Sequence, residues 1–122
     1  MIHLDYRDVR PIYAQVTDGF KEQISAGILQ TGEKLPSVRE LAAQLAINPN
    51  TIQRAYRQLE MEGWIVTVPG KGCFVRSDER LAEEEKKRLL NALDDCVNAL
   101  LAFGISRDAL IARIEKGGKP NA

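Results

Sequence analysis

Residues 35–75 decide the fold, and they read LPSVRELAAQLAINPNTIQRAYRQLEMEGWIVTVPGKGCFV. Ser37, followed three residues later by Glu40, forms a capping box and predicts the start of a helix. Pro49 disfavours helix at the residue before it, so the first helix is predicted to end near that point. Asn48 can then cap a second helix that has the proline in its first turn. Two short helices joined by a tight turn make a helix-turn-helix.

The second predicted helix, residues 49–62, has two different sides. Its apolar side carries Ile52, Ala55, Tyr56 and Leu59. Its polar side carries four residues at positions i, i+3, i+4 and i+7, namely Asn50, Gln53, Arg54 and Arg57. Amides suit the recognition of adenine, and arginines suit guanine or phosphate, so this stripe is typical of a helix in the major groove of DNA. An ordinary solvated helix face is the alternative interpretation.

A β-hairpin is predicted directly after this helix, which ends at Gly63. Residues 64–68 are rich in strand-forming side chains, and residues 73–76 return as the partner strand. The turn at residues 69–72 reads Pro-Gly-Lys-Gly, in which glycines allow close approach of a phosphate and Lys71 neutralises it. An ordinary hairpin loop would need the same glycines for backbone conformation alone. A hairpin at this place is the wing of a winged helix.

Four linked motifs carry a family resemblance. They are Pro11-Ile12-Tyr13-x-Gln15, Gly32-x-Lys34-Leu35-Pro36-Ser37-Val38-Arg39-Glu40-Leu41-Ala42, Asn48-Pro49-Asn50-Thr51-Ile52-x-Arg54-Ala55-Tyr56 and Gly70-Lys71-Gly72-x-Phe74-Val75. In this order and spacing they resemble the GntR family of bacterial transcription regulators, and the short C-terminal region is similar to its YtrA-type subfamily. The resemblance covers residues 2–76 and implies a winged-helix, DNA-binding dimer that is usually a repressor.

The resemblance also implies the site residues. Carried over position by position, the family's DNA contacts fall on Arg39, Asn48, Asn50, Thr51, Gln53, Arg54, Gly70, Lys71 and Gly72. Arg57 joins this set from the polar stripe alone. Cys73 departs from the subfamily, which more often has a small hydroxyl residue there. Its thiol is either an inert strand residue or, next to the wing tip, a redox-sensitive group.

The region at residues 77–122 is predicted to be helical and to mediate dimerisation. Ser77 and two acids open a long helix that is expected to reach Phe103. A wide apolar stripe on this helix comprises Leu89, Leu93, Cys96, Val97, Leu100 and Leu101. A second copy of the chain is the expected cover for this surface, in a two-fold interface. Packing back onto its own winged-helix domain is the alternative.

A further helix is predicted at residues 11–26, with an i+4 ladder of Ile12, Val16, Phe20 and Ile24 behind the helix-turn-helix. The expected fold is therefore mainly α with a small β-hairpin. It divides into a winged helix-turn-helix domain at residues 1–76 and a helical dimerisation region at residues 77–122.

Composition limits the remaining function classes. Basic and acidic residues balance at 17 each, so any positive charge that binds DNA must be local. No apolar run is long enough to span a membrane, and no leader is apparent, which predicts a cytoplasmic protein. The two cysteines do not indicate a disulfide framework. We find no nucleophile–base pair, metal-ligand spacing or phosphate loop, so no enzyme activity, metal or cofactor is expected.

The sequence therefore predicts a sequence-specific regulator, most simply a repressor, that binds a palindromic double-stranded DNA operator as a homodimer. The alternative is a winged helix that serves only as a protein-interaction module, for which the polar stripe would be incidental. The sequence does not indicate a small-molecule effector.

Overall fold

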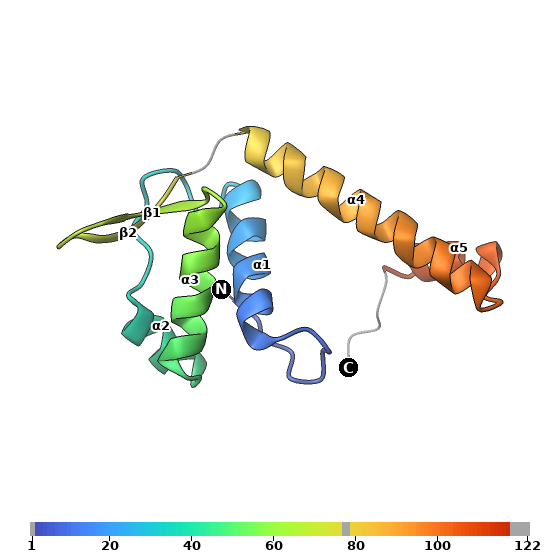
Figure 1. Cartoon of the computed structure of the whole chain (residues 1–122), viewed down its shortest axis with the longest axis horizontal. Coiled ribbons are helices and arrows are strands. Elements are labelled where there is room, and N and C mark those ends of the chain that lie inside the picture. The colour runs from blue at the N-terminus through green and yellow to red at the C-terminus, as the bar shows by residue number, and fades with distance from the viewer. Residues whose placement is uncertain (1, 77–78, 118–122) are drawn as a thin grey trace. The chain divides into compact units, whose positions relative to one another are not determined.

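The computed structural model of the protein describes residues 2–76 and 79–117, and that part of the chain is mainly helical with one hairpin (Figure 1). In chain order the elements are α1 (Ile12–Ser25), α2 (Val38–Leu45), α3 (Pro49–Met61), β1 (Ile65–Val68), β2 (Gly72–Val75), α4 (Glu79–Ala102) and α5 (Arg107–Glu115). The predicted fold class is confirmed. The chain divides into two compact units, Met1–Ala82 and Glu83–Ala122.

Both helix caps of the helix-turn-helix form as predicted. The Ser37 hydroxyl accepts the Glu40 N–H at 3.1 Å, and the Ser37 N–H donates to the Glu40 carboxylate at 3.4 Å. Asn48 accepts the Asn50 N–H at 2.8 Å through its side-chain oxygen. Ala46 ends α2 in the left-handed conformation, with φ 55°, and thereby turns the chain towards α3. Local capping chemistry thus fixes where the two helices meet.

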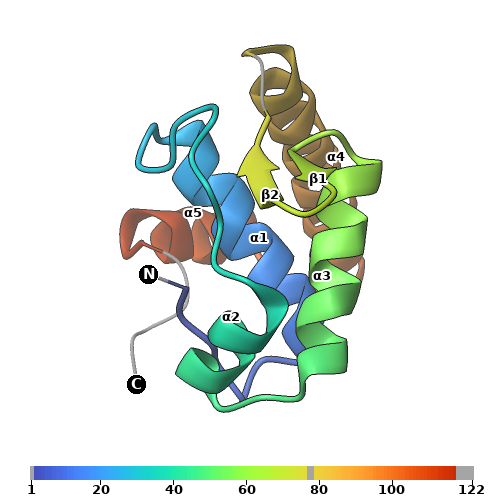
Figure 2. The same cartoon turned by 90° about the vertical axis from the view of Figure 1, so that its left-hand side faces the viewer.

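The core of the first unit lies between α1 and α3, which run side by side in both views (Figures 1 and 2). The apolar side of α3 is fully buried, as predicted: Ile52, Ala55, Tyr56 and Leu59. The ladder on α1 is confirmed at Val16, Phe20 and Ile24, which are buried, whereas Ile12 is partly buried. Phe20 meets Tyr56 edge to face, with ring centroids 5.8 Å apart. This packing holds the polar side of α3 outwards.

The hairpin has a third member that the sequence did not indicate. Residues 32–35, just before α2, run along β2, where Lys34 forms an antiparallel bridge with Phe74 (Figure 2). The Leu35 N–H donates to the Cys73 carbonyl at 2.9 Å, and the Val75 N–H donates to the Glu33 carbonyl at 2.9 Å. These bonds satisfy backbone groups on the free edge of β2. They tie the wing to the start of the helix-turn-helix.

The second unit contains most of α4, together with α5. Ser106 caps α5 by accepting the Ala109 N–H at 3.1 Å. Helix α4 ends at Ala102, one residue before the predicted end, and Ser77 lies outside the described residues. No helix within the described ranges is long and apolar enough to cross a membrane. Large apolar side chains of this unit are exposed in the single chain: Leu89, Leu90, Leu93, Leu100, Phe103, Ile105, Ile111 and Ile114.

Candidate nucleic-acid interface

The exposed side of α3 carries the predicted recognition stripe. Asn50, Gln53 and Arg57 are exposed, opposite the buried side of the same helix. Within the described residues, no hydrogen bond or ion pair occupies these three side chains. Their donors and acceptors are therefore available to an external ligand without the loss of an internal bond.

The two acids at the end of α3 are bonded to side chains of other residues. Glu60 accepts a hydrogen bond from the Thr67 hydroxyl on β1 at 3.1 Å. Glu62 pairs with Lys21 of α1 at 3.2 Å and accepts from Gln58 at 3.2 Å. A carboxylate between the stripe residues would repel DNA. Because both acids lie in the last turn of the helix or just after it, they leave the start of the stripe open to DNA.

Arg54 is the one stripe residue that has an internal partner. Its guanidinium lies over the ring of Tyr13 on α1, 3.8 Å from the ring centroid. A guanidinium stacked in this way keeps the N–H groups at its edge available for hydrogen bonding. The sequence grouped Arg54 with three freely projecting side chains, whereas the structure holds it against the neighbouring helix.

Three further predicted contacts lie at the starts of the two helices. Asn48 uses its side-chain oxygen as the cap of α3, which leaves its amide N–H₂ group as a donor. Thr51 is partly buried in the first turn of the same helix. Arg39 is exposed in the first turn of α2, and no carboxylate in the described part of the chain pairs with it.

The wing tip has the backbone that its glycines predict. Gly70 and Gly72 have φ values of 76° and 121°, which side-chain-bearing residues rarely adopt. The Lys71 N–H donates to the Val68 carbonyl at 3.0 Å and closes the turn. The Lys71 side chain is exposed, so its ammonium group is free to approach a phosphate.

Sequence reasoning missed a second lysine at the wing. Lys34 lies next to β2 through its bridge to Phe74, and its side chain reaches over Gly72. The two positions are far apart in the sequence, and no local signal pairs residues 32–35 with the hairpin. The lysine appears only as a member of a family motif, without a role.

Cys73 packs inwards from β2. Its side chain is partly buried against the core, with the sulfur 3.4 Å from the Thr67 hydroxyl. Nearby, the buried Tyr56 hydroxyl donates to the Pro36 carbonyl at 2.6 Å. Burial raises the pKa of Tyr56 well above its ordinary value, and the proximity of Cys73 and Glu40 adds to this effect. The phenol thus stays a neutral donor that joins α3 to the start of α2.

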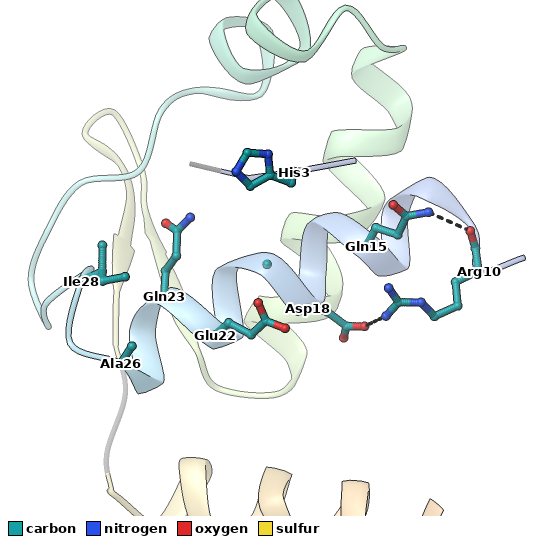
Figure 3. Close-up of a pocket in the computed structure, with 9 residues that line it drawn as sticks. His3, Arg10, Gln15, Asp18, Glu22, Gln23, Ala26 and Ile28 are labelled. Atoms are coloured by element: carbon teal, nitrogen blue, oxygen red, sulfur yellow. Dashed lines mark hydrogen bonds and ion pairs between the residues drawn. The ribbon is translucent and has the colours of Figure 1, made fainter. Parts of the chain in front are cut away.

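The only histidine of the chain, His3, lies beside an open groove of about 450 Å³ along α1 (Figure 3). Asp18 and Glu22 line this groove, and Arg10 forms an ion pair with Asp18. The carboxylates make the groove unsuitable for a phosphate backbone. Within the described ranges, no cluster of three or more His, Cys, Asp or Glu residues could hold a metal ion.

Gln15 accounts for the hydrogen bonding at one end of that groove. Its buried amide accepts the Asp5 N–H at 2.7 Å and donates to the Asp5 carbonyl at 2.9 Å. The same amide donates to the Arg10 carbonyl at 3.2 Å (Figure 3). These bonds fasten the N-terminal segment to α1. The groove is thus the place where that segment is anchored.

The chain is similar to known proteins both in sequence and in structure. The sequence pattern described as "Bacterial regulatory proteins, gntR family" matches residues 12–75. The chain is 36% identical over 129 residues to the "HTH-type transcriptional repressor YtrA" of Bacillus subtilis (strain 168), covering 99% of both chains. A "GntR family transcriptional regulator from Listeria monocytogenes" is 37% identical, with a TM-score of 0.72, covering 93% of this chain and 98% of that one.

A third similar protein was solved with DNA. The structure described as "AraR(DBD) in complex with operator" is 32% identical to this chain, with a TM-score of 0.53. The match covers 60% of this chain and 88% of the AraR chain. That similarity corresponds to the length of a winged-helix unit.

Proposed function

This chain belongs to the gntR family of bacterial regulatory proteins, and we propose that it is a repressor that binds a palindromic operator as a homodimer. Family membership makes it a DNA-binding transcription regulator and not an enzyme. The proposal adds which residues contact DNA, how the protein assembles, and the direction of its effect on transcription. Its site of action would be the chromosome, and hence the cytoplasm.

One observation carries the proposed DNA contact. Asn50, Gln53 and Arg57 project from one side of α3 and have no bonding partner among the described residues, while the opposite side of this helix is the core of the unit. In the major groove, the two amides suit adenine, and Arg57 suits guanine or phosphate. Arg39 and Lys71 would grip the backbone on either side. Backbone contacts fix the position of the protein, and the α3 side chains supply sequence preference.

The apolar side chains of the second unit support the proposed homodimer. Leu89, Leu93 and Leu100 on α4 are 53%, 47% and 40% exposed in the single chain. Cys96 is also exposed, whereas Val97 and Leu101 are partly buried. A monomer gains nothing from this much exposed apolar surface, whereas a second copy would remove it from water. A two-fold dimer would carry two α3 helices to half-sites about 34 Å apart, one turn of DNA.

The direction of regulation is supported by a relative. The protein named transcriptional repressor YtrA matches this chain over almost its entire length, including the helical C-terminal unit. A dimer that occupies an operator within a promoter blocks polymerase by exclusion alone. Repression of this kind needs no further domain.

The test is a binding titration on the DNA upstream of the gene that encodes the protein, combined with a footprint. We expect a protected palindrome and an affinity that falls steeply with salt, as release of counterions requires. Gln53→Ala should change the ranking of operator variants by about 1–3 kcal/mol at particular bases. Gln58→Ala is the matched control, because Gln58 lies on the same helix but bonds to Glu62.

The alternative, a winged helix that binds only protein, predicts a different result. Binding would then survive high salt, and neither glutamine variant would alter the preference among DNA sequences. Protection of a single half-site by a monomer would contradict the dimer and leave the DNA contacts intact. If supplying the protein increased transcription from the protected promoter, the proposed repression would be wrong, but the proposed DNA binding would stand.

A further inference from the structure

Few positive charges in residues 1–76 are free to bind an external ligand. Residues 1–76 hold nine lysines and arginines against eight acids. Arg7, Arg10 and Lys21 are in ion pairs, and Arg54 is stacked on Tyr13. Among the described residues, five cations of this region have no internal partner: Lys34, Arg39, Arg57, Lys71 and Arg76. Sequence and family resemblance assign three of them to DNA, and Lys34 has no assigned role.

The position of Lys34 is fixed by backbone hydrogen bonds. Its neighbours on both sides, Glu33 and Leu35, bond to β2, and Lys34 itself is bridged to Phe74. Residues paired across an antiparallel bridge project on the same side of the sheet. Cys73 and Val75, on either side of Phe74 in β2, point towards the core, so Phe74 lies on the outer face of the hairpin. Lys34, which is bridged to Phe74, therefore extends over that outer face. Its ammonium group is held at the wing although the residue precedes α2.

Gly72 provides the space for this side chain. A Cβ atom at position 72 would lie 2.9 Å from Cε and 3.7 Å from Nζ of Lys34. A side chain at position 72 would therefore require the flexible end of Lys34 to move. The glycine therefore serves two purposes, since its φ of 121° also shapes the wing tip. Gly72 consequently lies between Lys71, which precedes it in the turn, and the side chain of Lys34.

The chemistry of this pair favours one kind of ligand. The nearest acid in sequence, Glu33, turns its carboxylate to the Gln30 N–H at 3.4 Å and forms no ion pair with Lys34 in the described part of the chain. Lysine is a compact charge on a flexible stem, which suits a phosphate oxygen better than the edge of a base. Two such charges beside a glycine, with no side chain between them, suit a DNA backbone phosphate.

We propose that Lys34 is a second backbone-gripping cation of the wing and binds a DNA phosphate alongside Lys71. This rests on the proposed docking of the wing on DNA. In consequence, the wing contact is built from two distant parts of the chain, the segment before α2 and the hairpin. Because α2 begins directly after that segment, the contact also couples the placement of the wing to that of the helix-turn-helix.

Lys34→Gln tests this proposal in the full-length protein. Affinity should be measured by fluorescence anisotropy on the operator and on a scrambled duplex, from about 50 to 300 mM salt. We expect the slope of log K against log salt to fall in magnitude by about 0.9, and affinity to fall about five-fold at 0.15 M salt on both duplexes. The operator-to-scrambled ratio should not change. Lys34→Arg should restore the slope.

Two controls make the result specific. Lys87→Gln removes the same charge from an exposed position on α4 and should leave the slope unchanged. Lys71→Gln should lower the slope by a similar amount, and the double variant by about twice as much if the two lysines hold separate phosphates. A double variant no worse than either single one would mean that both hold the same phosphate. Both outcomes support a contact by Lys34.

The proposal fails if Lys34→Gln, correctly folded by circular dichroism, keeps the wild-type slope while Lys71→Gln loses part of it. Lys34 would then merely cover the hairpin. A Lys34→Met variant with the same slope as wild type would confirm that packing role. A wild-type protein without salt-dependent binding to any duplex would instead contradict the proposed function itself.

Discussion

The stacking of Arg54 on Tyr13 joins α1 to the recognition helix, and it can be measured directly. The guanidinium lies 3.8 Å from the ring centroid, while Arg54 itself is exposed. Pairs of this kind at exposed sites contribute about 0.5–1 kcal/mol. Tyr13→Leu removes the aromatic face and keeps an apolar side chain against the core, so the loss of the stack dominates its effect. We expect a loss of about that size in the free energy of unfolding.

A double-mutant cycle isolates the interaction from the other effects of each substitution. The free energy of unfolding in urea would be measured for the wild type, Tyr13→Leu, Arg54→Ala and the double variant. The coupling energy should be about 0.5–1 kcal/mol, and Tyr13→Phe, which retains the ring, should keep most of it. A coupling energy of zero would refute the stacked geometry.

The same variants reveal what Arg54 does on DNA. A stacked guanidinium is held in one orientation, so Tyr13→Leu should weaken operator binding about two- to five-fold, the equivalent of that coupling energy. In the Arg54→Ala background, Tyr13→Leu should have no further effect on binding. If Tyr13→Leu weakened binding equally in both backgrounds, Tyr13 would act on DNA independently of Arg54.

Three further predictions concern assembly, the thiol and the buried ion pair. Leu93→Asp combined with Leu100→Asp places charge in the proposed dimer interface, so sedimentation should show a monomer with lower operator affinity; a persistent dimer would place the interface elsewhere. Cys73 packs inwards, so Cys73→Ser should leave operator binding and its response to mild peroxide unchanged; release of DNA by the oxidised wild type alone would contradict this. Glu62→Ala leaves the 7% exposed Lys21 without its carboxylate and should lower the melting temperature, whereas Lys21→Met should be nearly neutral.

Short-range chemistry made the helix-turn-helix predictable. The Ser37–Glu40 box and the Asn48 cap each involve residues within three positions of one another, so the printed sequence contains the entire interaction. The buried side of α3 was equally legible, because helical periodicity alone determines which residues share a side. These features depend little on the rest of the chain.

The features that sequence reasoning missed depend on contacts between distant residues. Nothing near Lys34 indicates that it will pair with Phe74, since the two residues are distant in the sequence and meet only in the tertiary fold. The stack of Arg54 on Tyr13 likewise depends on how α1 lies along α3. Periodicity placed Arg54 on the correct side of its helix but contains no information about the neighbour that it meets there.

The net charge of the chain is a poor guide to whether the protein binds DNA. An even balance of acids and bases counts against a DNA-binding protein only if all charges are equally available. In the first unit Glu40 is used as a cap, Glu60 and Glu62 bind side chains of other elements, and the carboxylate of Glu33 turns to the backbone. The cations that have no ion pair among the described residues remain, so the local potential at the wing and helix starts can be positive although the sum is near zero. We therefore expect weak binding to arbitrary DNA and a large ratio of operator to non-specific affinity, since few phosphate contacts support the former and α3 supplies the latter.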